Sequence, residues 1–106
     1  MSLTLQLYRS TGVSTLRCEG NICFGGSAES LERAVKEFAN GILVIDLERV
    51  VLVDARGLGA LVELYHWSEE HRVRLYIANP RTQLQELLRL TGLSFLVEPE
   101  LSQMAS

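Results

Sequence analysis

Several residue types and patterns are scarce in this 106-residue chain, and each scarcity argues against a class of protein. The two cysteines, Cys18 and Cys23, have a spacing that matches no common metal site. No window approaches the roughly 20 apolar residues that a membrane-spanning helix needs. The first residues alternate polar and apolar side chains without a basic segment, unlike a signal peptide. We therefore expect a cytoplasmic protein with reduced thiols and no direct membrane insertion.

Positive charge is sparse and dispersed. Ten Lys and Arg residues stand against 13 Asp and Glu residues, which gives a formal charge of −3, and Lys36 is the single lysine. Nucleic-acid-binding surfaces usually gather basic residues, because these displace counterions from the phosphates. We expect no nucleic-acid partner.

The composition that is present is that of one globular domain. Hydrophobic residues make up 47% of the chain and charged residues 22%, which argues against disorder. Because 106 residues is close to the commonest size of one domain, we expect residues 1–106 to form a single domain.

The spacing of apolar residues predicts an α/β fold in the order β-β-α-β-α-β-α-β. Strands of period two at residues 3–8 and 13–19 would form an N-terminal hairpin around the turn signal at Thr11-Gly12. Residues 42–45 are a continuous apolar run, followed after a polar stretch by a second at 50–53. Further strands are expected at residues 74–78 and 95–97. We expect a mostly parallel, mixed sheet with right-handed crossovers through the helices.

Helix signals alternate with these strands. Ser27 and Asn79, the latter followed by Pro80, are expected to cap the first and third helices, which would end at Asn40-Gly41 and Gly92. The second helix would follow Asp54. Its expected buried stripe is Leu58, Leu61, Val62 and Tyr65.

No catalytic arrangement of residues is evident. The sequence has no GxGxxG, P-loop or GxSxG motif. Asp46 and Asp54 could form an acid–base pair, but both have capping roles available. His66 and His71 are five residues apart, which is not the spacing of a metal-binding pair. We predict that the protein is not an enzyme and that it needs neither cofactor nor metal.

The segment Asp54-Ala55-Arg56-Gly57-Leu58-Gly59 is the strongest candidate site. Asp54 can cap the second helix by accepting from the N–H of Arg56 or Gly57. Two glycines at a helix start cost about 1 kcal/mol each relative to alanine, so a reason for them is expected. Either another surface approaches the bare backbone, or the strand-to-helix junction is too tight for larger residues.

This segment and its surroundings resemble the STAS family, which includes anti-sigma-factor antagonists and cytosolic domains of anion transporters. Family members have a buried strand ending in Asp, a short apolar stretch, and Asp-Ser-Ser-Gly-Leu-Gly opening a helix. Asp46, Asp54, Gly57, Leu58 and Gly59 match this pattern, and residues 87–93 resemble the end of the family's last helix. The resemblance implies a STAS-like fold over nearly the whole chain and binding to an anti-sigma factor that is a serine kinase.

The chain departs from this family pattern at the two serine positions of the motif. The partner kinase phosphorylates the second serine of the motif, and the phosphorylated form does not bind. Ala55 and Arg56 occupy the two serine positions and carry no hydroxyl, so this switch cannot operate here. Arg56 does not mimic phosphoserine, whose charge is about −1.5 to −2. It would point to solvent or contact an acidic group of a partner.

A second departure lies in the loop of residues 20–27, where family members often carry an acid beside the interface. Cys23 stands near that place. It could be a redox sensor or a structural thiol. Phe24 could tuck under its own loop or contact a partner. The predicted partner-binding residues are Asp54, Ala55, Arg56, Gly57, Leu58, Cys23 and Phe24.

Three functions remain open. The first is a signalling regulator of transcription that binds an anti-sigma kinase. The second is a cytosolic accessory STAS subunit of a membrane transporter complex. The third is nucleotide binding at the start of the second helix, which the charge of Asp54 would oppose.

Overall fold

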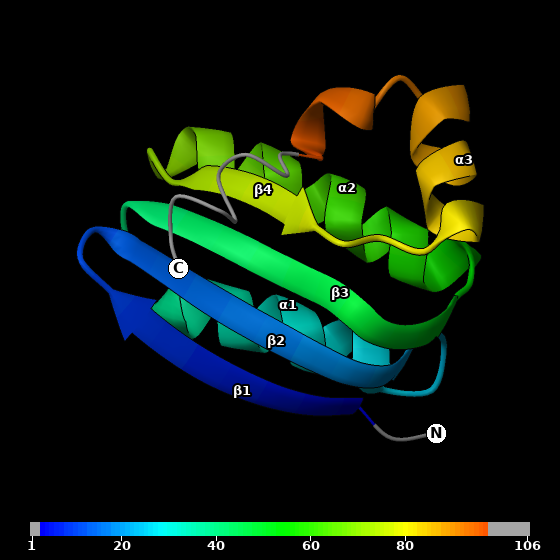
Figure 1. The fold of residues 1–106 in the computed structure, drawn as a ribbon, viewed down its shortest axis with the longest axis horizontal. Coiled ribbons are helices and arrows are strands. Elements are labelled where there is room, and N and C mark those ends of the chain that lie inside the picture. The colour runs from blue at the N-terminus through cyan, green and yellow to red at the C-terminus, as the bar shows by residue number, and fades with distance from the viewer. Residues whose placement is uncertain (1–2, 98–106) are drawn as a thin grey trace.

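The computed structural model describes residues 3–97, which form a sheet with the first two helices on one face (Figure 1). Their elements, in chain order, are β1 (Leu3–Ser10), β2 (Val13–Ile22), α1 (Ser27–Phe38), β3 (Ile42–Val53), α2 (Ala55–Glu70), β4 (Arg74–Ala78), α3 (Thr82–Leu90) and the short 3-10 helix η1 (Ser94–Leu96). The predicted α/β class and the order of the first seven elements are confirmed.

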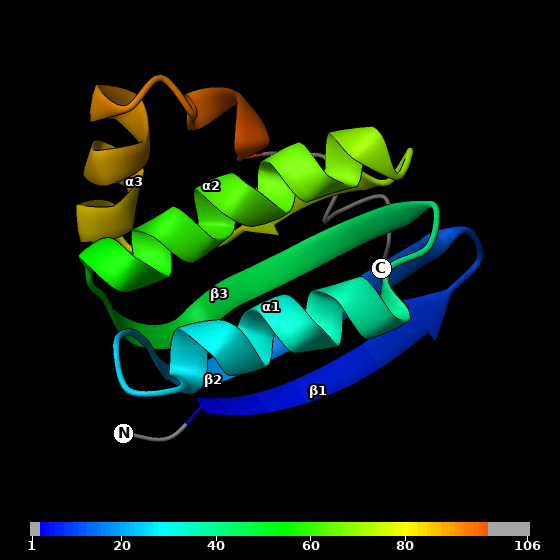
Figure 2. The same cartoon turned by 180° about the vertical axis from the view of Figure 1, so that it is seen from behind.

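The four strands lie in the sheet in chain order, β1-β2-β3-β4. β1 and β2 pair antiparallel as the predicted hairpin, and β2–β3 and β3–β4 pair parallel. Going from β2 to β3 and from β3 to β4, the chain moves to the neighbouring position on the same side of the sheet. Two crossovers of the same hand therefore place their helices on the same face. α1 and α2 accordingly lie side by side against that face (Figure 2). This arrangement brings the two helix starts to the same end of the sheet.

The core lies between this sheet face and the helices. Leu16, Cys18, Leu43 and Ile45 project from the strands, and Leu31, Val35, Leu61 and Leu64 meet them from α1 and α2. Cys18 is fully buried, and this burial, helped by the negative charge of Asp46, raises the pKa of its thiol to about 12. A thiol with so high a pKa is not a reactive nucleophile near neutral pH.

β3 is a single strand rather than a strand followed by a separate apolar run. It continues through the polar residues to Val53, and Asp46 therefore lies within the strand instead of ending it. β4 pairs only with Ile42–Asp46, while β2 follows β3 to its end through two shifts of register. At the residue where the pairing with β4 stops, the Asp46 carboxylate accepts the N–H of Glu48 and an amide hydrogen of Asn79, and it lies 3.8 Å from the Arg17 guanidinium.

Two predicted helix caps are wrong. The hydroxyl of Ser27 bonds with the backbone of Cys23 instead of capping, and the N-cap of α1 is Gly26. Asn79, the residue after β4, has a φ of 55° and donates a side-chain amide hydrogen to Asp46. It therefore does not cap a helix, and α3 begins only at Thr82. The predicted stop at Gly92 is confirmed, since this residue follows the C-cap with φ of 77°.

Two further expectations need correction. The buried residues of α2 are Gly57, Ala60, Leu61, Leu64 and Ser68, so of the predicted stripe only Leu61 is buried, while Leu58, Val62 and Tyr65 are half-buried. The predicted last strand is instead the 3-10 helix η1, followed by a single parallel bridge between Ile77 and Val97. Within residues 3–97 no helix is long and apolar enough to cross a membrane.

Two leucines test this description of the core. Leu61 is 1% exposed and Leu90 is 67% exposed. We expect Leu61→Ala to lower the free energy of unfolding by about 2–5 kcal/mol, because it removes buried methyl groups and leaves a cavity. Leu90→Ala should change it by less than about 0.5 kcal/mol. Urea denaturation followed by circular dichroism measures both, and equal losses would contradict this core.

Candidate functional site at the start of α2

The predicted site residues meet at the end of the sheet where β2 and β3 terminate. The loop from β2 to α1 and the junction from β3 to α2 lie at this end (Figures 1 and 2). The backbone N–H of Asp54 donates to the carbonyl of Ile22 at 3.3 Å, which continues the pairing of the two strands. The start of α2 is therefore anchored directly to the loop.

Asp54 connects the helix and the loop through its carboxylate. Its Oδ1 accepts the N–H of Gly57 at 2.8 Å, which caps α2 as predicted, and its Oδ2 accepts the N–H of Phe24 at 3.0 Å. These two bonds, with Phe24 the larger cause, hold the pKa of the Asp54 carboxyl below its ordinary value. The bond to Phe24 has no signal in the sequence, because 30 residues separate the two groups.

Gly57 is required by close packing. A Cβ atom at this position would lie 2.0 Å from the carbonyl oxygen of Ile22 and 3.0 Å from a methyl group of Val53. No side chain fits there without moving the backbone. For this glycine, the tight junction is the correct one of the two sequence interpretations.

Within the described part of the chain, no close contact explains why residue 59 is a glycine. A Cβ built on it meets nothing within 4 Å, and the residue is exposed. An exposed glycine inside a helix costs stability without a packing gain. The second interpretation, that a bare backbone admits another surface, therefore remains a prediction for Gly59.

The loop before α1 is held by its own hydrogen bonds. The hydroxyl of Ser27 accepts the N–H of Cys23 at 2.8 Å and donates to the carbonyl of Cys23 at 3.1 Å. Cys23 is 3% exposed, so this predicted binding residue lies in the core, consistent with a structural thiol. The interpretation of Phe24 as tucked under its loop is wrong, because its side chain is 79% exposed.

Arg56 forms an ion pair within the chain. Its Nη2 lies 2.7 Å from Oε1 of Glu32 and 3.8 Å from Oε2 of Glu29, both on α1. The hydrogen bond with Glu32 and the charges of Glu32, Glu29 and Glu63 raise the pKa of Arg56 above its ordinary value. The guanidinium thus already has acidic partners within its own chain, which the sequence did not indicate, while its side chain remains 35% exposed and its contact with a partner protein stays a prediction.

The other predicted site residues take different positions. Ala55 is exposed and Leu58 is half-buried. Sequence reasoning missed Glu29 and Glu32, the acids that approach the motif from α1 rather than from the preceding loop. Their only signal is indirect, because successive crossovers on one sheet face place α1 beside α2.

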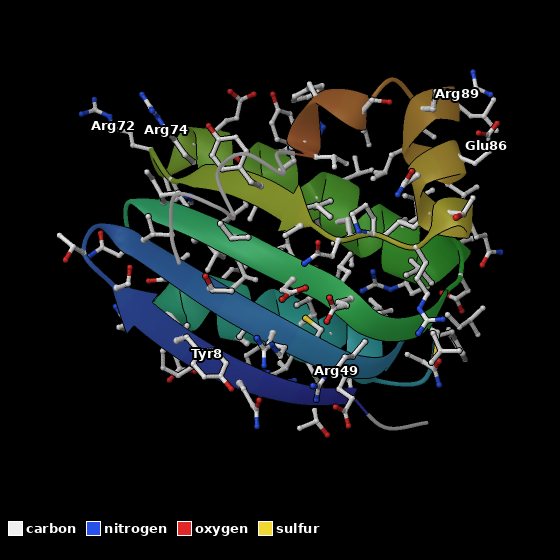
Figure 3. All side chains as sticks on the ribbon, in the orientation of Figure 1. Tyr8, Arg49, Arg72, Arg74, Glu86 and Arg89 are labelled. Carbon is white, nitrogen blue, oxygen red and sulfur yellow. The ribbon has the colours of Figure 1, made fainter. Side chains whose placement is uncertain are left out.

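The remaining polar groups do not extend this site. Asp46 interacts with Arg17 and Asn79, whereas Asp54 bonds with Phe24 and Gly57. Among residues 3–97 no group of His, Cys, Asp and Glu could hold a metal ion. A hollow of about 420 Å³, lined in part by Tyr65, lies beside the last turns of α2 and β4, away from this site. Arg72 and Arg74, which also line it, extend outward from the molecule (Figure 3).

The two glycines give a matched pair of substitutions. We expect Gly57→Ala to lower the free energy of unfolding by about 1–3 kcal/mol or more, because the new methyl group overlaps Ile22. Gly59→Ala should raise it by about 0.5–1 kcal/mol, because alanine favours the helix and meets open space. Chemical denaturation distinguishes the two, and a stable Gly57→Ala protein would contradict the junction described here.

The lowered pKa of Asp54 predicts a pH dependence. Because the folded state favours the charged form, Asp54 contributes stability above the unfolded pKa of about 3.9, and this contribution is lost as pH falls through the lower folded pKa. Asp54→Asn keeps an oxygen that can accept one N–H but does not titrate. The wild type should therefore lose more stability than this variant between about pH 5 and 2. Parallel curves would show that Asp54 carries no such linkage.

Comparison with known proteins agrees with this geometry. The family model described as the STAS domain matches residues 4–104. No curated protein matches the chain in sequence.

Solved structures share the fold at low sequence identity. An anti-sigma factor antagonist from Mycobacterium paratuberculosis has a TM-score of 0.75 at 24% identity, over 92% of this chain and 85% of that one. The Bacillus cell fate determinant SpoIIAA in its phosphorylated form gives 0.71 at 18% identity, over 91% and 90%. A sulfate transporter family protein from Wolinella succinogenes gives 0.70 at 23% identity, over 84% and 74%. With the family model covering nearly all of the sequence, the chain belongs to the STAS domain family.

Proposed function

We propose that this protein is a regulator that binds an anti-sigma factor of the serine-kinase type and cannot be released from it by phosphorylation. The observation that carries the proposal is the start of α2. Asp54 holds the motif and the neighbouring loop in one arrangement, while Arg56 occupies the place of the phosphorylated serine. The protein would bind constitutively, as a cytoplasmic component of transcriptional signalling and without catalysis of its own.

The surroundings of Arg56 support the loss of the switch. Glu32, Glu29 and Glu63 supply negative charge around this position, and the single guanidinium balances it in part. A phosphate here would face these carboxylates with about −1.5 to −2 of added charge. The site therefore favours a cation at position 56, and a serine there would leave these carboxylates without a balancing charge.

A cytosolic accessory subunit of a membrane transporter complex is the alternative. The fold likeness to a sulfate transporter family protein favours it, as does a STAS domain without a phosphorylatable serine. Such a subunit would co-purify with membranes and be released by detergent or high salt. Nucleotide binding finds less support, because Asp54 places a carboxylate at the helix start where a phosphate would lie.

The test is capture of partners from native lysate, followed by binding measurements with the purified kinase. We expect the wild type to bind with equal affinity in the presence and absence of Mg-ATP, since Arg56 cannot accept phosphate. Arg56→Ser combined with Glu32→Gln should bind without ATP and lose at least tenfold in affinity after incubation with it. The second substitution is needed because the Glu32 side chain, 12% exposed, would otherwise lose its cation.

Two controls make this result specific. Arg56→Ala with Glu32→Gln removes the same charges without adding a hydroxyl, so it should stay insensitive to ATP. Mass spectrometry should find phosphate only on the serine variant. Release of the wild type by ATP would contradict the proposal, and capture of transporter subunits instead of a kinase would favour the alternative.

A further inference from the structure

The feature that the motif does not explain is the exposure of Phe24. At 79% it is the most exposed large hydrophobic residue of the described chain, ahead of Leu90 and Val51. A single exposed apolar residue is ordinary on a protein surface. What distinguishes Phe24 is its position beside the start of α2, since its own N–H is bonded to Asp54.

The backbone that carries Phe24 is fixed on both sides. Asp54 holds the N–H of Phe24, and Ser27 holds both the N–H and the carbonyl of Cys23. Gly25 and Gly26 follow with φ of 104° and 113°, a conformation that turns the chain directly into α1 and that other residues rarely adopt. Phe24 is thus exposed to solvent on a loop whose path is determined by the hydrogen bonds of Asp54 and Ser27 and by the two glycines.

An exposed aromatic side chain on a hydrogen-bonded loop has the properties of an interface anchor. Binding energy concentrates in a few residues that enter pockets of the partner, and aromatic residues are prominent among them. Because the loop is ordered before binding, less conformational entropy is lost on association. The phenyl ring itself contributes through burial of its apolar surface.

The charges beside Phe24 indicate the chemistry of what covers it. Next to Asp54 lies Arg56, which is surrounded by the carboxylates of Glu29, Glu32 and Glu63. Three carboxylates against one guanidinium leave excess negative charge at the start of α2, to which the backbone of Phe24 is bonded through Asp54. A complementary surface carries an apolar pocket bordered by arginine or lysine side chains.

We propose that Phe24 is the anchor of this protein's interface, buried on binding in an apolar pocket of a partner protein whose rim is basic. The proposal rests on the proposed function for the identity of that partner, but not for the role of Phe24. It assigns selectivity to an apolar contact at the loop, where the family resemblance implies an acid. Arg56, neutralised within the chain, serves to hold α1 against α2 beneath this surface.

The experiment uses the full chain in its own cells. Phe24 is replaced by the photoreactive analogue p-benzoylphenylalanine, and irradiation should give a discrete covalent adduct. The same analogue at Leu90, which is 67% exposed on α3, is the matched control and should give none. The adduct partner is identified by mass spectrometry and purified for binding measurements.

Affinity then tests the anchor directly. Phe24→Ala should weaken binding of the purified partner by 30-fold or more, Phe24→Leu by less, and Leu90→Ala by less than twofold. Binding of the wild type should also weaken as salt rises from 50 to 500 mM, since opposite charges at the rim are screened. Thermal unfolding should show all variants folded, because the side chains of Phe24 and Leu90 are 79% and 67% exposed.

The outcomes separate the two proposals. An adduct with a serine kinase whose affinity falls in the Phe24→Ala variant supports both proposals. An adduct with a different protein whose affinity falls in the Phe24→Ala variant supports the role of Phe24 as an anchor and overturns the proposed function. Absence of a discrete adduct at position 24, or a Phe24→Ala protein that binds within twofold of the wild type, overturns the anchor whatever the partner is.

Discussion

The carboxylate of Asp54 is the interaction on which the arrangement of this site depends. One oxygen accepts an N–H of the helix that it caps, and the other accepts an N–H of a loop 30 residues earlier. A neutral cap such as serine offers a single, uncharged acceptor oxygen in place of the two carboxylate oxygens that receive these groups. The position and the charge of Asp54 together make the loop and the helix a single surface. The protonation of this one group is therefore linked to the geometry of both.

The topology of the sheet makes this connection possible. Chain-order strands with parallel crossovers place α1 and α2 side by side, and Gly57 lets the first turn of α2 approach the end of β2. Arg56 and Glu32 then face one another across the two helices. The ion pair of Arg56 and the close backbone contact of Gly57 belong to the same helical turn. Neither could form if the second crossover lay on the other face of the sheet.

Much of the fold follows from local patterns, whereas the site depends on contacts between distant residues. The hairpin, β4 and the stop at Gly92 were predicted because alternation, apolar runs and glycine act locally. The caps at Ser27 and Asn79 failed because their side chains bond with Cys23 and Asp46 instead. The prediction of the last strand was wrong because a short apolar run is equally compatible with a 3-10 turn.

The motif and its cap at Asp54 were predicted from sequence, but the partners of Arg56 and the exposure of Phe24 were not. The spacing of residues along one element contains no information about a neighbouring element.

The pair of Arg56 and Glu32 also has an evolutionary consequence. A change of Arg56 alone leaves a shielded carboxylate without its cation, and a change of Glu32 alone leaves the guanidinium without its closest acid. A substitution at either position therefore calls for a second substitution at the other if neither charge is to lose its partner. The two positions lie 24 residues apart on different helices, and they are expected to vary together rather than independently.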